Sequence, residues 1–142
     1  CELEVLSDYY RLLHFLVTKY QAKDVDGEQV KKNRQMKKLY RITSYIQEHY
    51  REDVTLETVA GIFGFSPTYL SRIFKKYANV NYKTYVLNVR VEYAYKELVN
   101  TGQSINKIAE SCGFPDGRSF TKAFAARFGI TPDKYRKDIR KR

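Results

Sequence analysis

The sequence repeats itself about fifty residues apart, and this repeat constrains the fold more than any other feature. At an offset of 49 residues the matching pairs are Leu56/Ile105, Val59/Ile108, Ala60/Ala109, Gly64/Gly113 and Phe65/Phe114. Further along the chain the offset becomes 50, and the matching pairs are Leu70/Phe120, Phe74/Phe124, Val80/Ile130 and Tyr85/Tyr135. The change of offset indicates that the second copy has one extra residue in its turn.

Each copy has the pattern of two short helices joined by a tight turn. Apolar residues recur three or four positions apart, which is helical spacing. Gly64 and Gly113 permit the positive φ that a tight turn between helices needs. The residues expected to cap the helices are Thr55, Ser66 (followed by Pro67), Ser104 and Asp116. Two such copies predict a duplicated helix-turn-helix, because a solenoid needs three or more stacked units.

A long helix is predicted between the copies, over residues 81–101, and Thr101-Gly102 ends it. A helix of nearly 20 residues is about 30 Å long. Major-groove faces on one side of B-DNA recur about every 34 Å. We therefore expect an all-α fold in which this helix joins a first helix-turn-helix unit, residues 55–80, to a second, residues 104–130.

The first 35 residues are expected to be separate from this domain, which would occupy residues 36–142. Residues 3–22 carry an apolar stripe at helical spacing and predict an extra N-terminal helix. Residues 21–35 are polar and predict a linker, with Gly27 as its clearest helix breaker. The N-terminal helix could pair with a second copy or dock on the domain. Because the chain starts at Cys1 without a methionine, we expect it to be part of a longer protein.

The charge is strongly positive and unevenly distributed. The chain holds 26 Lys and Arg against 16 Asp and Glu, a formal net charge of +10. Residues 1–50 contribute nine against seven, or +2, and residues 51–142 contribute seventeen against nine, or +8. This balance favours a nucleic acid partner first and a membrane surface second. A solvated basic surface is the alternative. No apolar run approaches the roughly 20 residues that cross a bilayer.

Other classes of protein find little support. His14 and His49 are far apart, and neither has a cysteine or carboxylate at ligand spacing, so we expect no metal and no cofactor. No catalytic triad is evident, which argues against an enzyme. RNA modules usually need strands with exposed aromatics or clamping glycine loops, and neither is seen. Cys1 and Cys112 make no disulfide framework, so a reducing cytoplasm fits.

The segments LETVAGIFGFSPTYLSRIFKKYANVNYKTYV and INKIAESCGFPDGRSFTKAFAARFGITPDKYR resemble the DNA-binding domain of the AraC/XylS family of bacterial regulators. Arg90, Ala94 and Leu98 on the central helix and the closing GITPDKYR add to this resemblance, which covers residues 36–138. It implies sequence-specific binding to double-stranded promoter DNA, with two recognition helices in adjacent major grooves. Members usually activate transcription, which implies RNA polymerase as a partner and the bacterial nucleoid as the location. A homodimer through residues 3–22 would fit the end of a preceding sensing domain.

The resemblance also implies which residues contact DNA. Those expected to read bases are Thr68, Ser71, Arg72, Gly117, Arg118, Thr121 and Lys122. Those expected to contact phosphates are Ser66, Lys75, Lys76, Ser104, Lys134 and Arg136. The alternative is that these are simply exposed helix residues. The second copy departs from the pattern because Gly117 has no side chain and Ala125-Ala126 replace a basic pair, so Arg118 and Lys122 would do more of the reading.

Overall fold

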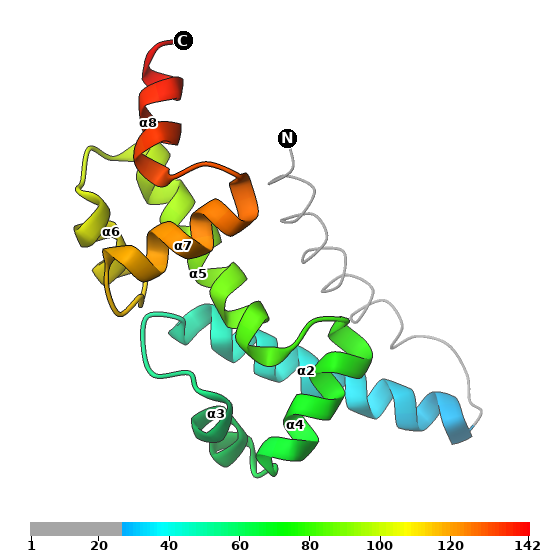
Figure 1. The fold of residues 1–142 in the computed structure, drawn as a ribbon. Coiled ribbons are helices and arrows are strands. Elements are labelled where there is room, and N and C mark those ends of the chain that lie inside the picture. The colour runs from blue at the N-terminus through cyan, green and yellow to red at the C-terminus, as the bar shows by residue number, and fades with distance from the viewer. Residues whose placement is uncertain (1–26) are drawn as a thin grey trace. The chain divides into compact units, whose positions relative to one another are not determined.

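The computed structural model describes residues 27–142, and these form seven α-helices, one π-helical segment and no strand (Figure 1). The all-α prediction is confirmed. Within this part of the chain the helices divide into two compact units. The first contains residues 27–49 and 54–85, and the second contains residues 50–53 and 86–142. The boundary falls inside the long helix α5 (Tyr82–Asn100), which contributes its first turn to one unit and the remainder to the other.

The first unit packs three helices around one apolar core. It consists of α2 (Gly27–His49), α3 (Leu56–Phe63), α4 (Pro67–Ile73), the π-helical segment η2 (Phe74–Ala78) and the first turn of α5. Its largest fully buried side chains are Leu39, Ile42, Ile46, Val59, Leu70, Phe74 and Tyr85. Each such side chain contributes about 1.5–3 kcal/mol by leaving water. Figure 1 shows that α3 and α4 meet at a tight corner.

Helix α2 begins earlier than the sequence predicts. The polarity of residues 21–35 predicts a linker, but from Gly27 onward this stretch is helical. Residues 28–38 are rich in Glu, Gln, Lys and Arg, which have high helix propensity and need no buried face. The prediction was therefore wrong over residues 27–35, because polarity alone does not distinguish a solvated helix from a linker. The helix predicted over residues 3–22 lies outside the described residues.

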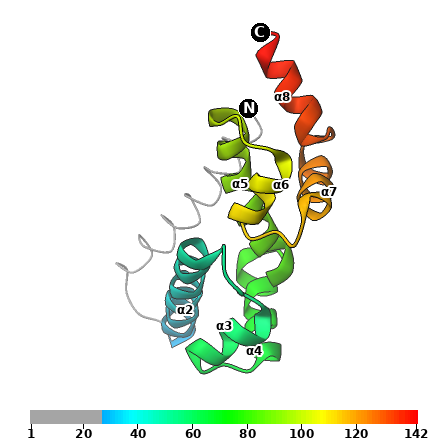
Figure 2. The same cartoon turned by 90° about the vertical axis from the view of Figure 1, so that its left-hand side faces the viewer.

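The second unit repeats this arrangement with α6 (Ile105–Ser111), α7 (Gly117–Phe128) and α8 (Pro132–Arg140), packed on the rest of α5. Helix α6 contacts both α5 and α7 (Figure 2). The fully buried side chains of this unit include Val91, Leu98, Ile108, Cys112, Phe120 and Phe124. Stacked and edge-on aromatic contacts extend from Phe124 through Phe128 to Tyr95 and Tyr135. These contacts hold α7 against α5 and α8.

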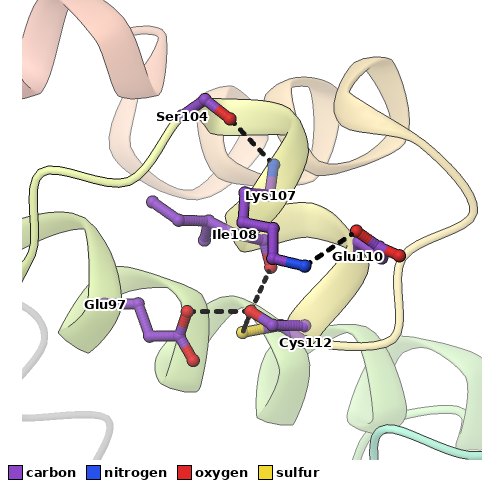
Figure 3. A network of polar contacts seen from close by, with 7 residues as sticks. Glu97, Ser104, Lys107, Ile108, Glu110 and Cys112 are labelled. Atoms are coloured by element: carbon purple, nitrogen blue, oxygen red, sulfur yellow. Dashed lines mark hydrogen bonds and ion pairs between the residues drawn. The ribbon is translucent and has the colours of Figure 1, made fainter.

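A small polar network connects α6 to Glu97 on α5 (Figure 3). The Ser111 hydroxyl lies 2.8 Å from Glu97 Oε2 and 3.0 Å from the carbonyl oxygen of Ile108. Next to it, burial raises the pKa of the Cys112 thiol to about 11. Cys112 therefore remains a neutral thiol at physiological pH and acts as a small apolar residue of the core.

The two helix-turn-helix corners use the same backbone device. Gly64 and Gly113 both adopt the left-handed conformation, with φ of 72° and 85°. The next residue then donates its N–H back to a buried alanine: Phe65 to the Ala60 carbonyl at 2.8 Å, and Phe114 to the Ala109 carbonyl at 2.9 Å. The N-cap of the following helix comes two positions after Gly64 and three positions after Gly113. This is the extra residue that the change of offset predicts.

The second helices of the two copies also match in length, although the one in the first copy ends in a π-helical segment. Residues 67–78 are helical in the first copy and residues 117–128 in the second. Asn79 (φ 58°) and Gly129 (φ 76°) end them in the same left-handed conformation, 50 residues apart. Asparagine is one of the few residues besides glycine that tolerates this backbone. The π-helical segment at residues 74–78 was not predicted, since nothing in the apolar spacing distinguishes it from an α-helix.

Gly113 has a second constraint that Gly64 lacks. A Cβ at Gly113 would lie 2.6 Å from the Tyr50 carbonyl oxygen and 3.1 Å from both Arg51 Cα and Arg90 Nε. Arg90 itself holds this backbone, because its Nε donates to the Tyr50 carbonyl at 2.8 Å and its Nη2 to the Glu52 carbonyl at 3.0 Å. By contrast, a Cβ at Gly64 would meet nothing within 4 Å.

The two glycines should therefore respond differently to the same substitution. We expect Gly64→Ala to lower the free energy of unfolding by about 1–2 kcal/mol, the cost of a left-handed backbone for alanine. Gly113→Ala should lower it by about 2–5 kcal/mol, because an overpacking cost of about 1–3 kcal/mol is added. Urea denaturation followed by circular dichroism measures both. Equal losses for the two variants would contradict the close approach at Gly113.

Candidate nucleic-acid interface

Three of the predicted base-reading side chains share one face of α4. Thr68, Ser71 and Arg72 stand at the first, fourth and fifth positions of a helical repeat, so they lie together. Thr68 and Arg72 are exposed and Ser71 is half-buried, whereas Leu70 and Ile73 face the core. The outer face of α4 thus presents hydroxyl groups and a guanidinium that can donate to base edges.

Contacts from α2 brace this helix, and the sequence did not predict them. The Tyr69 hydroxyl donates to Gln35 Oε1 at 2.5 Å, and Lys38 Nζ donates to the Tyr69 hydroxyl at 3.4 Å. Arg72 lies with its guanidinium carbon 5.7 Å from the centre of the Tyr69 ring. Tyr69 therefore links the middle of α2 to the arginine expected to read a base.

The predicted phosphate contacts of the first copy flank this face. Lys75 and Lys76 are both exposed on η2, directly after α4. Ser66 caps α4, and its Oγ accepts the Tyr69 N–H at 3.2 Å. The hydroxyl hydrogen of a capping serine remains able to donate to another oxygen. The arrangement brings a hydroxyl donor and two cations to the two ends of one short helix.

The second copy presents the corresponding residues around a concave surface. Arg118 and Lys122 are exposed on α7 and Thr121 is half-buried, while Phe120 and Phe124 face the core. A concavity of about 700 Å³ is lined by Ser104, Ile105, Asn106, Gly117, Arg118, Thr121, Lys122, Ala125, Asp133 and Arg136. The structure thus brings the predicted base-reading residues of α7 together with the N-terminal end of α6.

Side-chain caps fix where α6 and α7 begin. Ser104 Oγ accepts the Lys107 N–H at 3.2 Å, and Asp116 Oδ1 accepts the Ser119 N–H at 2.7 Å. The hydrogen bond from the Ser119 backbone lowers the pKa of the exposed Asp116 carboxyl, so the cap stays ionised at neutral pH. These caps were predicted from the sequence and are confirmed.

Arg136 differs from the other residues expected to contact phosphates. Lys134 is exposed on α8, but Arg136 is only 9% exposed. Its Nη1 donates to the Gln103 carbonyl at 2.6 Å and its Nε to the Leu98 carbonyl at 3.4 Å. Arg136 thus donates to one carbonyl in the last turn of α5 and to one in the loop that follows it. An isolated helix leaves the carbonyls of its last turn unpaired. We correct the expectation and leave Arg136 out of the proposed phosphate contacts.

The second helix of the second copy has fewer exposed cations than that of the first copy. Ala125 and Ala126 occupy the positions of Lys75 and Lys76. Arg127, which follows them, is half-buried, and its Nη1 donates to the Asn88 carbonyl at 3.1 Å. The exposed cations of α7 are therefore Arg118 and Lys122.

Residues 27–142 offer neither a metal site nor a membrane span. No group of three histidine, cysteine or carboxylate side chains suited to holding a metal ion occurs in that range. Within the same range, no helix combines the length and the apolar character needed to span a bilayer.

Comparison with known families gives a match over this part of the chain. The profile of a helix-turn-helix domain family matches residues 59–138, from α3 to α8 and more than half of the chain. The Msm operon regulatory protein of Streptococcus mutans is 30% identical over 138 residues, which are 97% of this chain and 49% of that protein. The chain spans a third to a half of the length of its first curated relatives, namely 33%, 49% and 41%.

Solved structures show the same fold. The C-terminal domain of AraT, a response regulator from Geobacillus stearothermophilus, has a TM-score of 0.66 and 35% identity, covering 69% of this chain and 82% of that one. The DNA-binding domain of AdpA, solved in complex with a target DNA, has a TM-score of 0.68 and covers 72% of this chain and 92% of that one. Its identity is 24%, so this likeness concerns the fold alone.

The Msm operon regulatory protein and AraT are both named as regulators, and the family profile covers both helix-turn-helix corners. The resemblance inferred from the duplicated motif and from GITPDKYR is confirmed. The chain belongs to the AraC/XylS family of transcription regulators, and residues 59–138 match its helix-turn-helix domain.

Proposed function

We propose that this protein activates transcription by inserting α4 and α7 into adjacent major grooves of promoter DNA. One observation carries the proposal. Each helix presents a polar triplet of two exposed residues and one half-buried residue at the same three positions. The triplets are Thr68, Ser71 and Arg72 on α4 and Arg118, Thr121 and Lys122 on α7. A recognition helix reads DNA through a few side chains on one face, and two equivalent faces in one chain fit a site with two parts.

The residue types suit the reading of base edges. Arg72 and Arg118 can each donate two hydrogen bonds to guanine O6 and N7, and Lys122 can reach the same atoms. Thr68, Ser71 and Thr121 can add a hydroxyl hydrogen bond, and the threonines a methyl contact. In the proposed complex the arginines carry most of the discrimination, because bidentate contacts are the most selective.

The register on the DNA would come from phosphate contacts. We assign these to Ser66, Lys75 and Lys76 in the first copy and to Ser104 and Lys134 in the second. Hydroxyl groups and lysines position a protein on the duplex without reading its sequence. Activation at a promoter further requires RNA polymerase as the protein partner and places the protein at the bacterial nucleoid.

The two-groove hypothesis predicts a bipartite DNA site. Helix α5 runs for 19 residues without glycine or proline, so the segment that joins the two copies has a defined length of about 28 Å. Selection from a random duplex pool should give two short motifs about one helical turn apart. Five extra base pairs between them should weaken binding at least about 100-fold, since one motif then faces the opposite side of the duplex. Unchanged affinity after the insertion would overturn binding in two grooves.

Base-reading and phosphate-contacting residues should respond differently to removal. Arg72→Ala should cost about 1–3 kcal/mol of binding and relax the preference at one or two positions of the selected site. Lys75→Ala, the matched control on the same face, should weaken binding to all sequences alike and reduce the log–log salt slope by about 1. Fluorescence anisotropy against single-base-pair variants measures both. Uniform weakening by Arg72→Ala would contradict its role in base reading.

We also propose that residues 3–22 join two copies of the chain in a homodimer. The apolar stripe of this segment motivates the proposal. Sedimentation at micromolar concentration should show a dimer for the full chain and a monomer after removal of residues 1–26, which leaves α2 complete. A monomer in both cases would end the dimer hypothesis and favour docking of the segment on the domain.

A further inference from the structure

Gly117, the first residue of α7, lies against the side chain of Asn106. Its φ lies outside the left-handed range, so its conformation is open to other residues. A Cβ at this position would overlap Asn106 Oδ1, and it would lie 3.2 Å from Asn106 Cγ and 3.6 Å from Asn106 Cα. The amide of Asn106, from α6, therefore occupies the space that a side chain at position 117 would fill.

This amide lies on the surface that the recognition helix presents. Asn106 is exposed, and it lines the same concavity as Arg118, Thr121 and Lys122. A carboxamide has an oxygen acceptor and two N–H donors, so it can form a donor–acceptor pair with adenine N6 and N7. Asn106 thus brings base-reading chemistry to the position where α7 itself has none.

The first copy has no equivalent of this arrangement. At an offset of 49 residues the position of Asn106 is taken by Glu57, which is exposed. A carboxylate offers no donor when ionised, and phosphates repel it. At an offset of 50 the position of Gly117 is taken by Pro67. The pairing of an asparagine with a glycine is therefore specific to the second copy.

We propose that Asn106 is a specificity-determining residue, which reads an adenine next to the base contacted by Arg118. The proposal rests on the proposed function of α7 as a major-groove recognition helix. The side chain reaches the groove from α6 across the space left by Gly117, so the second copy reads DNA with two helices. This also explains how a recognition helix that begins with glycine can retain a contact there.

Site selection and affinity measurements on three variants test the proposal. Asn106→Ala removes the amide. Gly117→Ala leaves Asn106 in the chain but places a methyl group where its amide lies. Asn100→Ala is the control, since Asn100 is an exposed asparagine of the same unit that does not line the concavity. Each variant is measured against every single-base-pair variant of the wild-type site, and its melting temperature is compared with that of the wild type.

The wild-type chain should prefer one A·T pair over its substitutes, and Asn106→Ala should reduce this preference in affinity by about 5- to 100-fold. This is the range for a bidentate base contact. Gly117→Ala should relax the same pair, and Asn100→Ala should match the wild type. Weakening by the same factor at every sequence would assign Asn106 to a phosphate and overturn the proposal. An unchanged profile would show a solvated side chain and would also overturn it.

Arg118→Ala, measured in parallel, separates this proposal from the proposed function. If Arg118→Ala relaxes a base pair and Asn106→Ala does not, α7 reads DNA and only the role of Asn106 fails. If the wild-type chain selects no sequence at all, the proposed function itself fails.

Discussion

The position of each recognition helix depends on one backbone hydrogen bond at its corner. The residue after the left-handed glycine donates its N–H to the carbonyl of a fully buried alanine, as in Phe65 to Ala60 and Phe114 to Ala109. This bond reverses the chain and satisfies carbonyls that the first helix would otherwise leave unpaired. The alanine is small enough for close approach of the second helix, and a capping side chain then starts that helix. Within each copy, this corner sets the direction of the second helix and hence of the side chains proposed to contact DNA.

The two copies keep this scaffold but differ in chemistry. The first copy follows its polar triplet with two exposed lysines, and the second follows it with two alanines and an arginine that turns inward. The second copy instead gathers its polar groups around a concavity that includes part of α6. Duplication preserves what the corner requires, whereas the outward residues are free to diverge because they contribute little to folding.

Some of the cations that make up the formal net charge are held within the second unit and are buried or half-buried. Arg90, Arg127 and Arg136 each donate to backbone carbonyls within the second unit. A guanidinium is suited to this role because it offers several donors in a fixed planar arrangement and loses its charge only at very high pH. These three arginines account for part of the +8 over residues 51–142 while holding helix ends and a loop. The cations proposed to contact DNA are the exposed ones.

The sequence by itself determined the helices of the two copies, their caps and the glycine corners, because these follow from residues a few positions apart. It therefore predicted that Thr55, Ser66, Ser104 and Asp116 begin helices and that Gly64 and Gly113 turn the chain. Only the tertiary structure decided that Arg136 is buried, that Tyr69 is braced by α2, and that Asn106 fills the space beside Gly117. Each of these depends on a contact between residues 11 to 38 positions apart. Local sequence sets the backbone of each element, but which side chains meet depends on how the elements pack.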